Sequence, residues 1–377
     1  MSADTEPPLA QTDLAEPSKV QNGSAVTQKE TTSSISSLDG ANDSKTTASV
    51  PAPPPSGPVK VPFQHPAANA QPTDPPKLTA DQEAKYAELL STVSAWTEIP
   101  TTAAKNSPEA PLTEDERMWL TRDCLLRYLR AVKWNVHEAP KRILATLTWR
   151  REYGIKEHTP EYISVENETG KQVILGYDNA ARPCLYLNPG KQNTQKSERQ
   201  IQHLVFMLER VIDLMVPGQE TLSLLVNFKE STSGSNPSVG QGRQTLSILQ
   251  NHYPERLGRA LVINVPWAVW GFFKLITPFI DPLTREKLKF NENLREHIPP
   301  SQLINTYGGD VEFVYDHSAY WPALVQLASE RRKEFQDRWV SGGKKIGEYE
   351  AYLRGANHPS LAELEKVQSE TTAAPAS

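Results

Sequence analysis

Cysteine is scarce in this chain. Cys124 and Cys184 are the only two cysteines among 377 residues. Two cysteines cannot build the disulfide framework of a small secreted protein, nor a zinc site made mainly of thiolates. The first residues also lack the basic stretch and the apolar run of a secretory signal. We therefore expect the protein to work in a reducing, cytosolic compartment.

An excess of positive charge is missing as well. The chain carries 40 Lys and Arg against 45 Asp and Glu, a formal net charge of −5. Nucleic-acid binding relies on a basic surface that displaces counterions, so no nucleic-acid partner is expected. Long apolar runs are also missing, because the most apolar stretch, 260–280, contains Asn264, Pro266, Lys274 and Pro278. It cannot be a simple membrane span.

Motifs of the common enzyme classes are not found. The sequence has no G-x-S-x-G elbow, no P-loop and no H-E-x-x-H zinc motif. The Gly-Gln-Gly at 240–242 lacks a third glycine and does not follow a strand, which favours an ordinary loop. None of the eight histidines has a second ligand at metal spacing. We therefore expect no enzyme, with no catalytic residue, metal or cofactor.

Changes in composition divide the chain into five parts. The first part is rich in proline, serine and threonine, and its single aromatic residue is Phe63. A segment with so little apolar surface cannot offset the conformational entropy that its backbone would lose on folding. The expected parts are a disordered tail over 1–78, a helical module over 79–155, an α/β domain over 156–318, a C-terminal helical segment over 319–354 and a flexible tail over 355–377.

Two capping boxes mark helix starts in the second part. Thr79 is followed three residues later by Gln82, and Thr113 is followed by Glu116. Apolar residues at helical spacing follow each box, and those after the second box continue to Leu129. We therefore expect one helix after each box.

Strands and helices alternate in the third part. An alternating pattern over 160 residues indicates an α/β layer fold with a largely parallel or mixed sheet. The expected elements are a hairpin of strands at 173–177 and 184–188, a helix at 197–216, and strands at 221–228 and 260–265.

The stretch after the last of these strands is apolar nearly all round. It reads WAVWGFFKLITPFI over 267–280, with Lys274 as its one charged residue. A helix on a protein surface normally has a polar face. This one is therefore a core helix, a helix in a membrane interface or a cover over an apolar cavity. The core helix is the plainer interpretation of the residues alone.

A series of short motifs surrounds this stretch in a fixed order. They are CLLRYLRAVKW at 124–134, WRREYGI at 149–155, YPER at 253–256, N-x-P at 264–266, PFIDPLTREK at 278–287 and YGGD at 307–310. In this order they closely resemble the Sec14-like (CRAL-TRIO) lipid-binding family over roughly residues 80–355. Within that family the sequence looks most like the fungal Sec14 homologues linked to drug resistance and phosphatidylinositol transfer.

The resemblance implies an α/β lipid cage. A mixed sheet forms the floor of an apolar cavity, a hinged helix forms its gate, and a small helical module precedes both. The implied gate and cavity residues are Trp267, Trp270, Phe272, Phe273, Phe279, Leu222 and Leu224. Tryptophan suits the boundary between water and lipid, so the gate is expected to touch membrane surfaces transiently.

The resemblance also implies a headgroup site. Family members that bind phosphatidylinositol use a glutamate of the YPER corner with a threonine and a lysine of the DP-x-T-x-x-K segment. By motif these are Glu255, Thr284 and Lys287, with Arg256 beside them. Without the resemblance, a solvated Lys287 and a surface ion pair between Glu255 and Arg256 are the plainer interpretations.

Two departures from the family pattern bear on the ligand. Val132 stands where the family has an arginine that contacts phosphate, and Arg256, Arg130 and Lys133 are the candidates to replace it. The branch that binds phosphatidylcholine has hydroxyl side chains where this chain has two leucines, at 222 and 224. Leucines leave a buried phosphate unpaired. We therefore expect an apolar second ligand such as a sterol, and not phosphatidylcholine.

The resulting expectation is a non-enzymatic phosphatidylinositol transfer protein. It binds one lipid and exchanges it between cytosolic membrane faces, or presents it to a lipid kinase, with an influence on phospholipid and sterol homeostasis. We expect peripheral visits to the endoplasmic reticulum, the cell periphery or lipid droplets. The alternatives are a sterol-binding or sensing module and an interaction scaffold with an empty domain.

Overall fold

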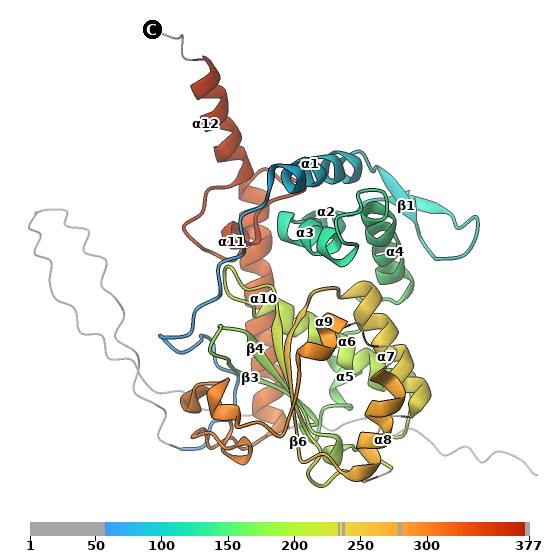
Figure 1. Cartoon of the computed structure of the whole chain (residues 1–377), viewed down its shortest axis with the longest axis vertical. Coiled ribbons are helices and arrows are strands. Elements are labelled where there is room, and N and C mark those ends of the chain that lie inside the picture. Colours follow the sequence, from blue (N-terminus) through green and yellow to red (C-terminus); the bar gives the residue numbers. More distant parts are fainter. Residues whose placement is uncertain (1–56, 233, 236–237, 278–279, 281, 374–377) are drawn as a thin grey trace, which may run out of the picture. The chain divides into compact units, whose positions relative to one another are not determined.

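The computed structural model describes residues 57–373 except 233, 236–237, 278–279 and 281. The N-terminal helices form a small module with an apolar interior of its own (Figure 1). Its elements are α1 (Ala80–Ser94), β1 (Glu98–Pro100), β2 (Glu109–Pro111), α2 (Glu114–Trp119), α3 (Arg122–Ala131) and α4 (Ala139–Glu152). Strands β1 and β2 pair as a short antiparallel ribbon.

Both expected capping boxes are present. The Thr79 hydroxyl accepts the Gln82 backbone N–H at 3.2 Å, and the Gln82 side chain accepts the Thr79 N–H at 3.0 Å. Thr113 and Glu116 form the same reciprocal pair. The helix after Thr113 is shorter than expected, because Thr121 caps a new helix by accepting the Cys124 N–H at 3.0 Å.

A five-stranded mixed sheet forms the second layer. Its strands, in spatial order, are β3 (Gln172–Tyr177), β4 (Pro183–Leu187), β5 (Leu222–Asn227), β6 (Leu257–Ile263) and β7 (Leu288–Phe290). The first two strands form the expected antiparallel hairpin, and the other neighbours are parallel. The sheet confirms the expectation of a largely parallel or mixed α/β layer.

Helices connect the parallel strands and cover the sheet (Figure 1). They are α6 (Glu198–Asp213) between β4 and β5, α7 (Val239–His252) between β5 and β6, and α8 (Trp267–Ile276) with α9 (Pro282–Glu286) between β6 and β7. The remaining helices are α5 (Pro160–Ser164), α10 (His317–Ser341), α11 (Glu350–Leu353) and α12 (Leu361–Ala373). No helix among the described residues is both long and apolar enough to cross a membrane.

The strand register decides which residues share a face of the sheet. Leu224 lies opposite Ala260, and Val226 lies opposite Val262, which in turn is opposite Phe290 of β7. Paired residues point to the same side of a sheet, and successive residues of a strand alternate. Leu224, Val226 and Phe290 therefore share one face. Tyr186 lies on the opposite face, where its ring packs edge-on against Tyr307 at 4.8 Å.

The YGGD motif has a structural explanation. Gly308 has φ +92°, a conformation that favours glycine. A Cβ on Gly309 would lie 1.9 Å from the carbonyl oxygen of Leu303, so this position admits no side chain. Arg295 then holds the turn by donating to the Gly308 carbonyl and pairing with Asp310, both at 2.6 Å.

Two expected tails contain ordered structure. Val59 pairs with Phe313 as a parallel bridge, and Lys60 forms an ion pair with Asp316 at 3.2 Å. Phe63 packs against the main apolar core. The expectation of disorder was therefore wrong for 57–78. This segment has few apolar residues of its own, but it is ordered by contacts with residues more than 250 positions away. Helix α12 likewise lies within 355–377, where a flexible tail was expected.

Candidate lipid-binding site

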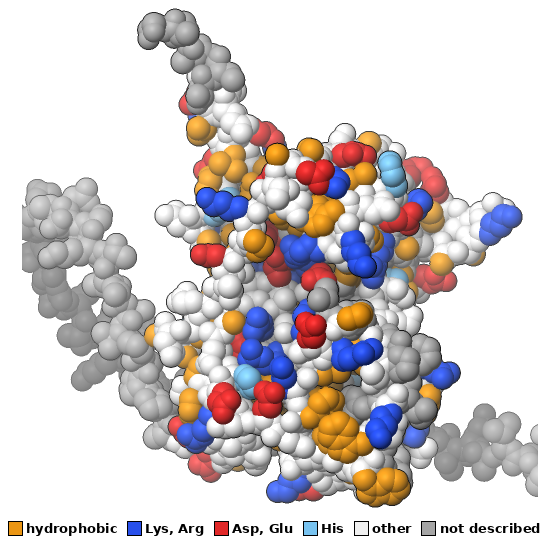
Figure 2. All heavy atoms as spheres, viewed as in Figure 1, with side chains coloured by type: hydrophobic (Ala, Val, Ile, Leu, Met, Phe, Trp, Pro, Cys, Tyr) orange, Lys and Arg blue, Asp and Glu red, His pale blue; other side chains and the backbone are white. Residues whose placement is uncertain are grey.

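Helix α8 presents tryptophans to solvent. Trp267 is 88% exposed and Trp270 is 38% exposed, whereas Val269 between them is buried. The Trp270 ring packs on Phe290 of β7 with 4.7 Å between ring centroids. Because Phe290 lies on the sheet face that carries Leu224 and Val226, this contact sets α8 beside that apolar face. Figure 2 shows apolar side chains gathered on the surface in the region of α8.

The other implied gate residues are partly outside what the structure describes. Residue Phe279 and the side chains of Phe272 and Phe273 belong to that undescribed part, so their role stays a prediction. Leu222 is buried, and Leu224 is half-buried against the main core. Both leucines fall on the sheet face that carries Phe290. A lipid-lining role for them also stays a prediction.

Three implied headgroup residues lie at one edge of the sheet. Glu255 precedes β6 and Lys287 precedes β7, so both stand at the amino ends of neighbouring parallel strands. The Lys287 carbonyl accepts the Ala260 N–H at 2.9 Å, and its N–H donates to the Thr284 carbonyl at 3.2 Å. All three side chains are half-buried. No described side-chain contact joins Glu255 to Lys287.

The backbone at Glu255 is unusual. Its φ is +61°, which costs a non-glycine residue of order 1 kcal/mol or more. The corner is held in place by Tyr253, which is buried and donates its hydroxyl to Glu209 at 2.7 Å. Strain of this kind occurs most often where a side chain must be aimed for a function.

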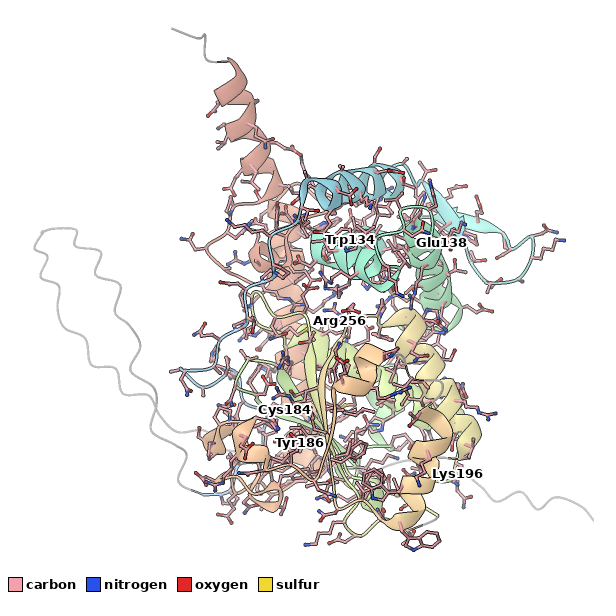
Figure 3. The ribbon with its side chains drawn as sticks, viewed as in Figure 1. Trp134, Glu138, Cys184, Tyr186, Lys196 and Arg256 are labelled. Carbon is pink, nitrogen blue, oxygen red and sulfur yellow. The ribbon has the colours of Figure 1, made fainter. Side chains whose placement is uncertain are left out.

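Arg256 points elsewhere. Its guanidinium donates to the Glu220 carbonyl at 2.9 Å and to the Met215 sulfur at 3.6 Å, and it lies 3.9 Å from Glu350. Figure 3 shows Arg256 between the sheet and the N-terminal helices. Its described contacts are thus all with these interior groups. The structure does not bring Arg256 together with Glu255 and Lys287, and we drop it from the headgroup set.

Those contacts are part of an ion network that the sequence did not reveal. Arg127 of α3 lies 2.9 Å from both Glu220 and Glu350, and Arg354 lies 3.2 Å from Glu350. Burial alone would raise the pKa of Glu350, but Arg127, Arg256 and Arg354 together hold it well below its usual range. An arginine inside an otherwise apolar helical stripe was the only signal for this network.

The position of the family's missing arginine is now defined. Val132 caps α3 and packs against the apolar interior of the N-terminal module. Of the candidate replacements, Arg130 is engaged with Glu220 at 2.9 Å, and Arg256 is buried in the same network. Lys133 is exposed, and no described carboxylate pairs with it.

Comparison with known proteins identifies the fold. The CRAL/TRIO domain model matches residues 167–309, and the model of the CRAL/TRIO N-terminal domain matches residues 85–145. This chain belongs to the CRAL/TRIO family. The expected family and fold class are confirmed, with the N-terminal helical module preceding the mixed sheet.

Fungal proteins are among its relatives. It is 56% identical to a CRAL-TRIO domain-containing protein of Schizosaccharomyces pombe over 80% of this chain, although it spans only 30% of that longer protein. It is 43% identical to phosphatidylinositol transfer protein PDR17 of Saccharomyces cerevisiae, over 66% of this chain and 74% of the relative. It is 29% identical to the SEC14 cytosolic factor of Candida glabrata, over 50% of this chain and 70% of the relative. The family assignment supports lipid binding by the sheet domain.

Proposed function

We propose that this protein is a non-enzymatic carrier that binds one phosphatidylinositol molecule and exchanges it between cytosolic membrane faces. The observation that carries the proposal is the 43% identity to a phosphatidylinositol transfer protein over three quarters of that relative's length. The apolar sheet face beside α8 and the retained glutamate, threonine and lysine support it. Presentation to a lipid kinase, and visits to the endoplasmic reticulum, cell periphery or lipid droplets, belong to the same proposal.

The energetics of exchange explain why α8 is apolar. Moving two acyl chains of about 16 carbons out of water is worth on the order of 25 kcal/mol, at ~0.8 kcal/mol per CH₂. A carrier must therefore offer the chains an apolar surface as continuous as a membrane. Trp267, already exposed, is placed to enter the bilayer interface while α8 moves away from Phe290. The lipid then crosses between two apolar environments without meeting water.

The headgroup end supplies polar contacts. A phosphodiester held away from water needs a cation and hydrogen-bond donors. In the proposal the Lys287 ammonium binds the phosphate, the Thr284 hydroxyl donates to it, and Glu255 accepts from inositol hydroxyls. Of the three candidate replacements for the missing family arginine we propose Lys133, because it is exposed and no described carboxylate pairs with it.

The test is transfer of radiolabelled phosphatidylinositol between vesicles by the full-length protein. Lys287→Ala and Glu255→Gln are each expected to lower the initial rate at least tenfold, the worth of one charge-assisted hydrogen bond. The matched control is Lys229→Ala, an exposed lysine at the opposite end of the parallel strands. Transfer that survives both headgroup changes would show that these residues do not hold the lipid.

A second ligand is suggested by the two leucines of β5. We propose that the space over Leu222 and Leu224 takes an apolar molecule such as a sterol, and that sterol binding or sensing is the alternative function. Mass spectrometry of lipids that co-purify with the protein separates these cases. Phosphatidylinositol without sterol supports the carrier alone, and sterol without phosphatidylinositol supports the alternative. Phosphatidylcholine at the occupancy of phosphatidylinositol would contradict the assignment of the leucines.

A further inference from the structure

A cavity lies away from α8 and the apolar sheet face. It has a volume of about 280 Å³ and is enclosed by α3, the end of α6, the 252–256 corner, α10 and the segment from Glu350 to Arg354. Gln64 and His65, from the segment once expected to be disordered, close one side. None of the gate residues that the structure describes lines it. A distinct, partly polar cavity of this size has room for a small ligand.

Most carboxylates of this cavity already have a cation of their own. Of the four described carboxylates that line it, three each pair with one arginine: Glu209 with Arg150 at 2.7 Å, Asp213 with Arg210 at 3.0 Å, and Glu334 with Arg331 at 3.3 Å. Only Arg331 among these three arginines lines the cavity itself. These pairs are locally neutral and leave the remaining charges of the wall to be considered.

The remaining wall is strongly positive. Arg127, Arg256, Arg332 and Arg354 line the cavity, and among the described residues Glu350 is the one further carboxylate that does so. Arg127 and Arg256 are 3% and 8% exposed. Arg332 lies over the Phe335 ring, with 5.9 Å from its guanidinium carbon to the ring centroid. It makes no direct ion pair with a described residue, although its charge acts to lower the pKa of Asp115 and of Asp213.

Two acidic side chains lie behind this wall and reduce the surplus. Glu220 is shared between Arg127 and Arg130, so it neutralises one of those two charges. The Asp123 carboxylate accepts the Glu350 N–H at 2.7 Å. With Glu350 and Asp123 both ionised, four arginines of the wall still face two negative charges. The positive charges of the wall therefore exceed these negative charges by two, in a largely buried place.

The pKa of Arg256 is consistent with this excess of positive charge. Burial is the largest of the causes that together lower its pKa to about 10; the neighbouring Arg127 and Arg354 act in the same direction, and Glu350 acts against them. Arg256 shares Glu350 with Arg127 and Arg354 and has no carboxylate of its own among the described residues. A buried guanidinium in this position is stabilised when an anion from outside completes its contacts. Arginine is also the residue whose planar donors best match phosphate oxygens.

We propose that this cavity binds a small phosphate-bearing anion at the junction of the N-terminal module and the sheet domain. The phosphate accepts hydrogen bonds from Arg332 at the half-buried side and from Arg256 at the buried side. The site is separate from the lipid headgroup site, because neither Glu255, Thr284 nor Lys287 lines it. The two sites are adjacent in sequence, because Arg256 of this site directly follows Glu255 of the headgroup site.

The test is calorimetric titration of the full-length protein with inorganic phosphate and, separately, with inositol 1,4,5-trisphosphate at constant ionic strength. Both probes contain phosphate groups, and their relative affinities show whether the site prefers free phosphate or a phosphate attached to a sugar alcohol. Arg332→Gln is expected to weaken binding about tenfold, by loss of one charge-assisted contact. Arg332→Lys should restore part of it. Lys333→Gln, an exposed neighbour already paired with Asp337, should change nothing.

Three outcomes would overturn the proposal. They are no heat of binding with either probe at millimolar concentration, equal affinity in Arg332→Gln and the unchanged protein, and binding that disappears in Lys287→Ala but persists in Arg332→Gln. The last result would assign the anion to the lipid headgroup site. A measurement that needs no variant is hydrogen exchange of the unchanged protein, in which phosphate should slow exchange at 252–256 and 331–335 and leave α8 unaffected. Uniform or absent protection there would contradict the site.

Discussion

Helices α6 and α8 flank the same sheet and are both rich in apolar residues, yet they use them in opposite ways. The apolar stripe of α6 is buried, with Val205, Met207 and Val211 at most 1% exposed. Its polar edge is held by ion pairs such as Arg150–Glu209. Helix α8 instead leaves Trp267 88% exposed. An apolar side chain left in water gives no folding stability, which indicates that α8 is built for a partner outside the chain.

The sharpest test of this contrast is stability. Met207→Ala in α6 is expected to lower the free energy of unfolding by about 2–5 kcal/mol, because it leaves a cavity in a closed core. Trp267→Ala in α8 should change it by less than about 0.5 kcal/mol, because the ring packs little in the native state. Urea denaturation followed by circular dichroism measures both. Equal losses in the two variants would show that α8 is an ordinary core helix.

Helices α6 and α8 should also differ in how they contribute to the pH dependence of stability. Burial alone would raise the pKa of Glu209, but the Arg150 guanidinium holds it at about 2. A carboxyl whose folded pKa lies below its unfolded value stabilises the fold above the unfolded pKa and loses that effect as the pH falls. The shift corresponds to about 3 kcal/mol, lost between roughly pH 4.5 and 2.

The measurement is the pH dependence of the unfolding free energy. Glu209→Gln should flatten the curve over that range, whereas Glu161→Gln, an exposed glutamate of α5, should leave its shape intact. Trp267→Ala should also leave it unchanged, since α8 has no acidic residue. An unaltered slope in Glu209→Gln would mean that the buried pair on α6 does not govern acid stability.

Membrane contact should depend on α8 and not on other exposed apolar residues. Trp267→Ser is expected to weaken binding to phospholipid vesicles about tenfold, which corresponds to roughly 60 Å² of apolar surface no longer buried in the interface. Val340→Ser, an exposed valine of α10, serves as the control. Vesicle cosedimentation measures the partition coefficient. If the two variants bind equally, the membrane-facing surface lies elsewhere.

A smaller effect is expected from charge. Lys274, in the last turn of α8, is exposed, so Lys274→Gln should weaken binding to anionic vesicles by roughly fivefold, at about 1 kcal/mol per lysine near such a surface. Zwitterionic vesicles should not distinguish the variant, and the difference should shrink at high salt because the charges are screened. A difference that persists on neutral vesicles would point to altered packing of α8.

Local signals predicted much of the fold. The capping boxes at Thr79 and Thr113 place two helix starts correctly, since a box involves residues three positions apart. The hairpin of β3 and β4 follows from two apolar runs and a short turn. Thr121 was overlooked as a third cap, so one long helix was expected where two exist. The cap was overlooked because apolar residues continue at helical spacing from α2 into α3.

The site was predictable only in part. Motif order predicts Glu255, Thr284 and Lys287 as headgroup residues, and the parallel pairing of β6 with β7 brings Glu255 and Lys287 to the amino ends of neighbouring strands. No spacing in the sequence relates Arg127 to Glu350, which are 223 positions apart and in contact. The contact of Arg256 with Glu350 also joins residues far apart in the sequence, so the sequence did not predict it. The motif alone had assigned Arg256 to the lipid headgroup.

By itself the sequence determined where most helices and strands begin and which faces are apolar, because those features depend on neighbours within a turn of helix or two residues of strand. It also determined that α8 lacks a polar face. Only the tertiary structure decided that Val59 finds Phe313, that Trp270 rests on Phe290, and that the arginines near Glu350 outnumber its carboxylate neighbours. Contacts of this kind join segments far apart in the chain, and their energy arises only when the whole fold has assembled.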